Sequence, residues 1–184
     1  MINFKDFLQE SSLSRIYRQY KEHDSGTISA FRGNFTKDEN LDRSRKLKQI
    51  LENKGYSVTK INGTYIENFG TRSARPVREE SYIVVDINDD GDLEKTLRSL
   101  GEQFLQDSIT FSSKNGKYYL IGTSPYSKDI YPGYGVKEKL GKPMFSEDGE
   151  FYSEINNRPF IISSTLVYIH YIIFKSYHKS IIFI

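Results

Sequence analysis

Six polar side chains stand where the predicted strands and helices begin or end: Arg32, Asn40, Arg43, Glu79, Glu80 and Gln106. A guanidinium group binds carboxylates and phosphates through paired hydrogen bonds, and a carboxylate can accept a proton during a reaction. If the fold gathers these side chains, they form a small polar cleft. The simpler interpretation is that each one caps a helix or pairs with a neighbour, because structural ion pairs are common. On sequence grounds we favour the simpler interpretation.

A second basic group lies in the irregular stretch 64–78, where Arg72, Arg75 and Arg78 surround Pro76. The dipeptide Asn62-Gly63 before it is typical of a tight turn. Long loops on a compact scaffold often carry function. Together with Arg32 and Arg43, these arginines could contact the phosphates of a nucleotide or a nucleic acid.

Familiar catalytic signatures do not occur in the sequence, whether for phosphate-binding loops, dinucleotide-binding loops or nucleophile elbows. The run His23-Asp24-Ser25 has the residue types of a hydrolase triad, but three adjacent positions in one loop cannot adopt triad geometry. With no cysteine, disulfides, thiolate catalysis and cysteine-bound zinc are excluded.

Four aspartates gather around the end of one predicted strand: Asp86, Asp89, Asp90 and Asp92. They could hold a divalent cation, but the stretch lacks the distal bidentate glutamate of a calcium loop. A turn followed by the start of a helix explains them without a metal, because the helix dipole favours negative charge there. We therefore expect no metal and no cofactor.

The composition is that of a globular chain, with 184 residues, 37% of them hydrophobic and 27% charged. A formal net charge of +2 argues against bulk electrostatic binding of nucleic acid. Basic residues nevertheless predominate in 41–80 and acidic residues in 81–112, which suits docking to a host protein or, less well, to a nucleic acid. The apolar tail at 163–184 contains no uncharged run of the roughly 20 residues that span a bilayer, so a membrane partner is not expected.

The order of predicted elements favours an α+β fold. The β-branched run 79–87 is typical of a buried central strand, and leucines in 92–105 recur with a helical period. Strand, helix, strand, strand, helix, strand is the split β-α-β, ferredoxin-like order, with both helices on one face of the sheet. An N-terminal helix would cover part of the other face, and a three-layer α/β arrangement is the alternative.

Changes in composition divide the chain into four predicted segments. These are a leader at 1–10, an α/β core at 11–122, a Pro/Gly/Tyr-rich loop with short elements at 123–162, and the tail at 163–184. The tail has the composition of translated AT-rich DNA, so it could be non-native sequence outside the cooperative core.

The leader carries the first resemblance to known proteins. Its pattern of Phe4, Phe7 and Leu8 followed by Gln9 and Glu10 resembles the capsid-targeting leader of internal head proteins in T-even-like bacteriophages. That resemblance implies a phage protein, packaged in the virion head and cut by the prohead protease after Leu8-Gln9-Glu10. The implied location is the head interior or the host cytoplasm.

A second resemblance covers 28–111, which is similar to a family of small bacterial domains without an assigned function. Its pattern is met here by Ala30, Asn40, Leu47 to Leu51, Gly55-Tyr56-Ser57-Val58, Glu79-Glu80-Ser81, and Phe104 to Phe111. This resemblance implies a fold and no activity.

Two functional hypotheses follow from the sequence. The first is a phage accessory protein that acts by binding a host factor, because the leader is present and catalytic motifs are not. The alternative is an enzyme that acts on a nucleotide or a nucleic acid through the Arg/Asn/Glu cleft. The residues alone leave open whether the protein is an enzyme.

Overall fold

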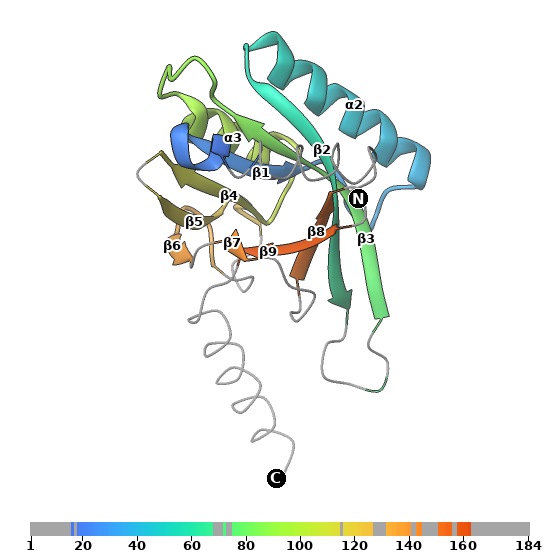
Figure 1. The fold of residues 1–184 in the computed structure, drawn as a ribbon. Helices are drawn as coiled ribbons and strands as arrows, with labels where there is room; N and C mark the ends of the chain where they lie inside the picture. The colour runs from blue at the N-terminus through green and yellow to red at the C-terminus, as the bar shows by residue number, and fades with distance from the viewer. Residues whose placement is uncertain are drawn as a thin grey trace, which may run out of the picture.

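The computed structural model describes residues 16, 18–67, 72, 75–114, 116–126, 132–140, 143–144, 151–155 and 158–162. Helical residues at 18–22 precede two named helices, α2 (Lys37–Asn53) and α3 (Leu93–Gln103). The strands are β1 (Ser25–Ser29), β2 (Ser57–Glu67), β3 (Arg75–Val85), β4 (Ser108–Ser113), β5 (Lys117–Gly122), β6 (Lys137–Leu140), β7 (Pro143–Met144), β8 (Phe151–Ile155) and β9 (Arg158–Ile162). Figure 1 shows their arrangement.

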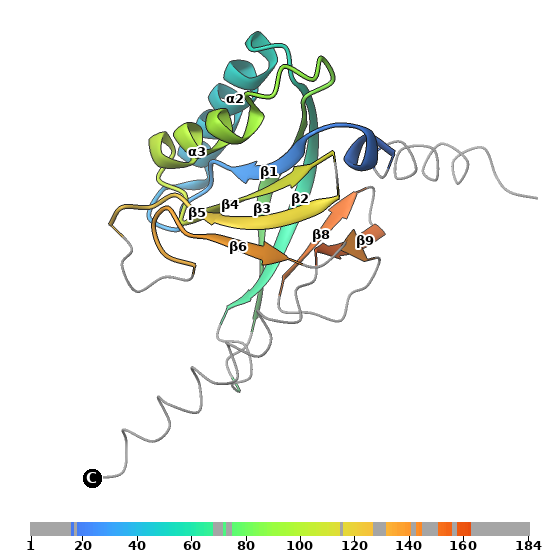
Figure 2. The same ribbon diagram turned by 90° about the vertical axis from the view of Figure 1, so that its left-hand side faces the viewer.

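The described strands lie in the order β6-β5-β4-β1-β3-β2-β8-β9-β7, and each neighbouring pair is antiparallel. Within this sheet, β4-β1-β3-β2 with α2 after β1 and α3 after β3 is the split β-α-β arrangement. The predicted α+β, ferredoxin-like fold is confirmed, and the three-layer α/β alternative is not adopted by these residues. Figure 2 shows α2 and α3 side by side on one face of the sheet.

Helix α2 begins at a capping box that its sequence encodes. The Thr36 hydroxyl accepts a hydrogen bond from the backbone N–H of Glu39, and the Glu39 carboxylate accepts one from the backbone N–H of Thr36 at 2.7 Å. The helix ends before Gly55, whose φ of 87° few other residues adopt. The helix therefore starts and ends at residues whose types favour a helix start and a helix end.

The main core lies between the two helices and the sheet. The apolar stripe of α3, which includes Leu93, Leu97 and Leu100, packs with Leu47 and Leu51 of α2. From the sheet, alternate residues of β3 point into this core, Tyr82 and Val84 among them. Gly26 permits the close packing here, because a Cβ at that position would lie 2.5 Å from Leu97 Cδ1.

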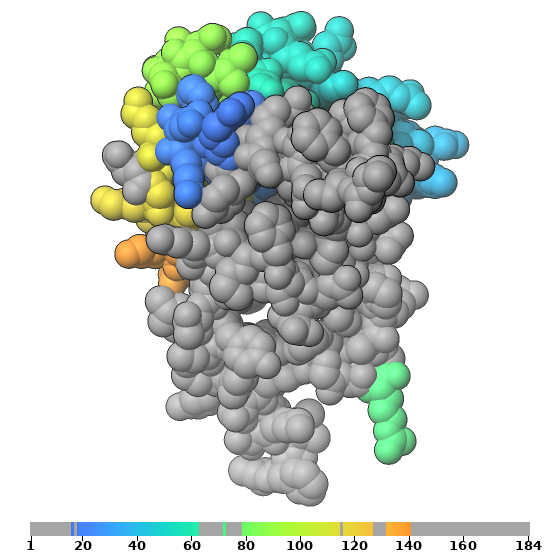
Figure 3. Space-filling view, viewed as in Figure 1, coloured from blue at the N-terminus to red at the C-terminus, as the bar shows by residue number. Residues whose placement is uncertain are grey.

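The opposite face of the sheet carries a second apolar cluster. Ile83 and Val85 of β3 meet Ile16 and Tyr20 there, and Tyr20 stacks on Tyr118 with ring centroids 6.0 Å apart. The N-terminal helical residues thus cover part of this face, as the sequence predicts. In the space-filling view this segment, in blue, lies beside the yellow surface of β4 and β5 (Figure 3).

The prediction of a turn at Asn62-Gly63 followed by an irregular stretch is wrong. β2 continues through both residues to Glu67, and β3 starts at Arg75, so the two strands form a long hairpin. Asn62 pairs with Glu80 and Gly63 with Glu79 in the ladder. Pairing on both sides, with β3 and with β8, extends the strand beyond its local turn signal.

The described part of 123–162 is continuous with the sheet. β6 pairs with β5 and β8 pairs with β2, so this segment lengthens the sheet at both ends. Within the described ranges, no helix has the length and apolar character needed to cross a membrane. The leader at 1–10 and the tail at 163–184 lie outside the described residues, and what the sequence suggests of them stays a prediction.

Candidate functional site

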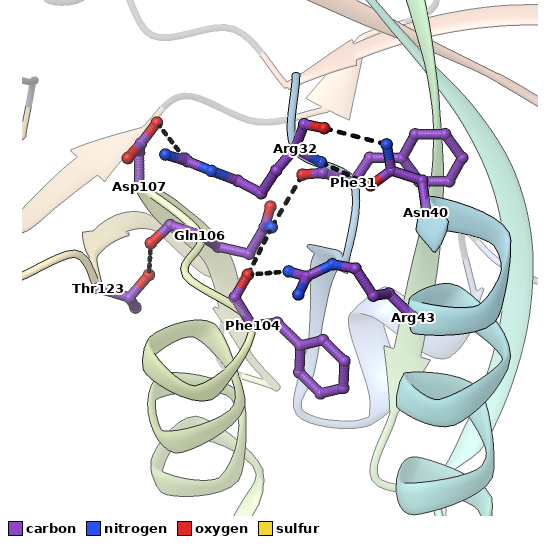
Figure 4. A network of polar contacts seen from close by, with 8 residues as sticks. All are labelled: Phe31, Arg32, Asn40, Arg43, Phe104, Gln106, Asp107 and Thr123. Atoms are coloured by element: carbon purple, nitrogen blue, oxygen red, sulfur yellow. Dashed lines mark hydrogen bonds and ion pairs between the residues drawn. The ribbon is translucent and has the colours of Figure 1, made fainter. Parts of the chain in front are cut away.

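Four of the six predicted cleft residues meet where β1 ends, next to the N-terminal part of α2 and the α3–β4 junction (Figure 4). Asn40, which is buried, holds the chain after β1 in place. Its Oδ1 accepts a hydrogen bond of 2.9 Å from the backbone N–H of Arg32, and its Nδ2 donates to the carbonyls of Arg32 and Phe35 at 3.0 and 3.2 Å. All the polar atoms of this amide are thereby used on the loop.

Arg43 bridges two separate backbone segments. Its Nε donates to the carbonyl of Ala30 at 2.8 Å, and its Nη2 donates to the carbonyl of Phe104 at 2.6 Å. The guanidinium lies 4.4 Å from the ring centroid of Phe35 and 5.6 Å from that of Phe104. Burial lowers the pKa of Arg43, and the nearby charge of Arg32 lowers it further.

Gln106 completes the connection between these segments. Its Nε2 donates to the carbonyls of Phe31 and Phe104, at 3.1 and 3.3 Å. The main-chain carbonyl of Gln106 accepts a 2.6 Å hydrogen bond from the hydroxyl of Thr123, which follows β5. Three strand ends and one helix end are therefore fixed relative to one another by side chains that bond to backbone.

Arg32 reaches a partner that the sequence did not single out. Its Nη1 lies 2.9 Å from Oδ2 of Asp107, and both side chains are about one-third exposed, at 32% and 33%. Unlike Asn40 and Gln106, this pair is accessible to solvent. It is the part of the network that a ligand could contact.

Glu79 adds a second carboxylate to this group. Burial raises its pKa above the usual carboxyl range, the Arg32 guanidinium opposes that rise, and the Asp107 carboxylate adds to it. Glu79 therefore senses the charges of both members of the ion pair. A half-buried carboxylate that interacts with these charges can attract a positively charged group.

Glu80 does not join the cluster. Successive residues of a strand point to opposite faces, and Glu80 lies with Tyr82 and Lys60 on the helix-covered face. The Tyr82 hydroxyl donates to Glu80 Oε1 at 2.7 Å, and Lys60 forms an ion pair with the same carboxylate. Burial and the Glu80 carboxylate raise the pKa of Tyr82.

The predicted basic loop is divided between a turn and a strand. Arg72 is an exposed turn residue, and Arg75 and Arg78 belong to β3, where they pair with Glu67 and Thr64 of β2. The side chains of Arg75 and Arg78, like the whole of Leu8, Gln9 and Glu10, lie outside the described residues.

Four participants were not among the predicted site residues: Phe31, Phe104, Asp107 and Thr123. Phe31 and Phe104 take part through backbone carbonyls and Thr123 through its hydroxyl, which no motif signals. Asp107 follows Gln106 directly, so its position just before β4 was the available signal. Arg32 and Asp107 are 75 positions apart, and only the sheet topology brings them together.

The network thus has two parts with different chemistry. Asn40, Arg43 and Gln106 bond to main-chain groups and build the frame. Arg32, Asp107 and Glu79 form what we call the charged triad, with one positive and two carboxyl groups. Within the described ranges, no three His, Cys, Asp or Glu side chains are grouped so as to hold a metal.

Residues 26–158 match the model of the S-adenosylmethionine lyase family. The chain belongs to this family. The match covers more than half of the chain, from β1 to the start of β9, and includes every residue of the network in Figure 4. Among curated proteins, none matches the chain.

Membership of this family corrects the first functional hypothesis. A protein that acts only by binding a host factor is the wrong interpretation, because the matched family is one of enzymes. The error arose from treating missing motifs as a sign of missing catalysis. The alternative, an enzyme that uses the polar residues at the strand ends, is closer to what the match indicates.

Proposed function

We propose that this protein is a lyase that acts on S-adenosylmethionine. The observation that carries the proposal is the family match over residues 26–158, which spans the whole split β-α-β unit. This substrate is a nucleoside derivative. Like the nucleotide of the alternative hypothesis from the sequence, it contains a nucleobase and a sugar, but it has no phosphate groups.

The charged triad suits the charges of this substrate. S-adenosylmethionine carries a carboxylate, an ammonium and a sulfonium group. Arg32 offers a guanidinium that can bind a carboxylate through two hydrogen bonds. Glu79 and Asp107 offer carboxylates for the ammonium or the sulfonium, with Arg32 and Asp107 accessible at about one-third exposure.

Cleavage of the C–S bond does not require the protein to donate a proton. A lyase breaks its bond without water and without a redox change. When a C–S bond of a sulfonium breaks, the electron pair stays on sulfur, and a neutral thioether leaves without needing a general acid. The carbon fragment then either loses a proton to water or to a carboxylate of the site, or bonds to the substrate's own carboxylate. Holding the substrate in a reactive shape is therefore the main contribution that we assign to the site.

Purified full-length protein incubated with S-adenosylmethionine tests the proposal. Mass spectrometry should show loss of substrate and a matching amount of thioether product, above the slow decay seen with heat-inactivated protein. No excess over that control would refute a lyase acting on this substrate.

Variants of the triad test the placement of the site. We expect Arg32→Met and Glu79→Gln to lower kcat/KM by about 10- to 1000-fold, as loss of a charged contact does. The matched control is Arg45→Met, which removes an arginine from an exposed Arg–Asp pair on α2 with Asp42. Activity in wild type but equal activity in all three variants would place the site elsewhere.

A further inference from the structure

The connection between β3 and α3 has the residue order of a calcium-binding loop. It reads Asp86-Ile87-Asn88-Asp89-Asp90-Gly91-Asp92. Asp86, Asn88 and Asp90 occupy the first, third and fifth positions of the pattern Asp-x-Asp/Asn-x-Asp/Asn-Gly, and Gly91 occupies the sixth. The sequence lacks the distal glutamate of that pattern.

The backbone of this loop curls around the carboxylate of Asp86. Asp89 has a φ of 55° and Gly91 a φ of 79°, both in the left-handed region. The backbone N–H of Gly91 donates a hydrogen bond of 2.9 Å to Asp86 Oδ2. The carboxylate of Asp86 therefore points into the loop.

The second oxygen of the same carboxylate is the deciding observation. Asp86 is only 1% exposed, and its Oδ1 has no hydrogen-bond partner among the described residues. Burying a carboxylate oxygen without a partner is unfavourable. A cation bound in the loop would satisfy this oxygen.

We propose that the 86–92 loop is a calcium site. The ligands are Asp86 Oδ1 and the side-chain oxygens of Asn88 and Asp90. The main-chain carbonyl of Asp92, at the seventh position, is not counted, because it accepts a hydrogen bond from the backbone N–H of Thr96 in α3. Water fills the remaining coordination positions. Calcium fits better than magnesium, because it accepts six to eight oxygen ligands in irregular geometry.

Neighbouring residues show which carboxylates are available. Asp89 contacts Nδ1 of His23 at 3.3 Å and Nζ of Lys114 at 3.9 Å, so we do not count it as a ligand. Burial raises the pKa of Tyr56, a side-chain hydrogen bond with Thr96 opposes the rise, and the charges of Asp86, Asp92 and Asp90 add to it.

Affinity should be low. The twelfth position, where a calcium loop places its bidentate glutamate, is Leu97, which is fully buried in the core. With two carboxylates and no bidentate ligand, we expect a dissociation constant of about 10⁻⁴ to 10⁻³ M, as in the weakest loops of this kind.

This site is separate from the charged triad. The backbone N–H of Asp86 bonds to the carbonyl of Asp24, just before β1 begins, whereas Arg32 follows the other end of that strand. In Figure 1 the connection from β3 to α3 lies at the upper end of the molecule, near the α2–β2 connection. The calcium proposal does not depend on the lyase proposal, and either can fail alone.

Thermal unfolding of the full-length protein tests the proposal. The protein is first treated with a chelator and then compared in calcium, in magnesium and in sodium chloride of equal ionic strength. At a calcium concentration about 100 times the dissociation constant, the melting temperature should rise by about 5 to 10 °C. Terbium luminescence excited through tyrosine, and displaced by calcium, gives a readout that does not rely on stability.

Two variants separate binding from general charge effects. Asp90→Ala removes an exposed ligand, and Asp86→Asn removes the buried carboxylate that the pattern requires at its first position; both should abolish the calcium shift and the terbium signal. Asp42→Ala, at an exposed aspartate on α2, is the control and should respond as wild type does. No melting shift and no terbium signal in wild type would overturn the proposal, and so would an unchanged response in Asp90→Ala. Should Asp86→Asn fail to fold, Asp90→Ala alone still decides.

Discussion

Arg43 of α2 and Phe104 at the end of α3 are joined by a 2.6 Å hydrogen bond from the guanidinium Nη2 to the main-chain carbonyl. The same guanidinium also donates to the carbonyl of Ala30, just after β1. One side chain therefore sets the separation between the segment that carries Arg32 and the segment that carries Asp107. The solvent-accessible ion pair depends on a residue that does not belong to it.

Arg43→Lys should destabilise the protein by about 1 to 3 kcal/mol, because an ammonium group cannot reproduce the planar two-carbonyl bridge and leaves a carbonyl unpaired. Chemical denaturation measures the free energy of unfolding. Arg45→Lys, on the exposed face of the same helix, is the matched control and should change it by less than about 0.5 kcal/mol. Equal effects of the two substitutions would show that the bridge has no stabilising role.

Relative to wild type, the Glu79→Gln variant should become more stable as the pH rises from about 4 to 7. Burial raises the pKa of Glu79 in the native state, so over that interval the unfolded chain loses the proton first and the native state is disfavoured. The glutamine variant lacks this penalty. Melting temperatures of variant and wild type across that pH range measure the difference.

Glu39→Gln provides a comparison of opposite sign. Hydrogen bonds from the backbone N–H and hydroxyl of Thr36 lower the pKa of Glu39, so its stabilising contribution is present above the usual carboxyl pKa and is lost as the pH falls through the lowered value. The melting temperature of the Glu39→Gln variant should fall relative to that of wild type as the pH rises. A rise in both profiles would contradict the assignment for Glu39, and a fall in both would contradict the assignment for Glu79.

Gly101→Ala should lower the melting temperature although alanine is the better helix former by about 1 kcal/mol. A Cβ at Gly101 would lie 2.7 Å from Oγ1 and 2.8 Å from Cβ of Thr123, closer than packed atoms allow. Thr123 cannot move away easily, because its hydroxyl is bonded to the Gln106 carbonyl. Gly33→Ala, where a Cβ meets nothing within 4 Å, is the control. A stabilised Gly101→Ala would show that the contact relaxes freely.

Lys137→Gln should loosen β6 without unfolding the rest of the sheet. The Lys137 ammonium lies 2.6 Å from Glu94 Oε2 of α3 and 4.2 Å from the ring centroid of Tyr119. Hydrogen exchange of residues 137–140 should accelerate by about 3- to 10-fold, corresponding to roughly 1 kcal/mol. Lys139→Gln, on the same strand, should leave exchange unchanged, and equal acceleration by both would refute the anchoring role of Lys137.

Local patterns predicted the elements with the clearest sequence signals. The leucine spacing in 92–105 identifies α3, and the β-branched run 79–87 identifies the inner part of β3. The prediction failed where long-range pairing outweighs a local signal. Asn62-Gly63 has the residues of a turn, but pairing with Glu80 and Glu79 keeps it in an extended strand.

The site was only partly accessible from the sequence. Arg32, Asn40, Arg43 and Gln106 were recognised as polar residues at element ends, and Glu79 as part of a strand start. The sequence could not tell which of Glu79 and Glu80 faces the site. Neighbouring residues of a strand point to opposite faces, but which face each one takes depends on the register of the strand. Asp107 was missed because its partner, Arg32, follows β1 and is distant in the sequence.

The place of β1 in the sheet has a consequence for synthesis. This strand is the first to leave the ribosome, yet it pairs on one side with residues 81–85 and on the other with residues 110–112. It can join β3 only after residues 81–85 have been translated, and β4 only after residues 110–112 have followed, which takes several seconds at about 5 to 20 residues per second. Such distant pairings also slow folding, because loop closure precedes the contacts that reward it. We therefore expect β1, although it is translated before β3 and β4, to become ordered only when these later strands are available.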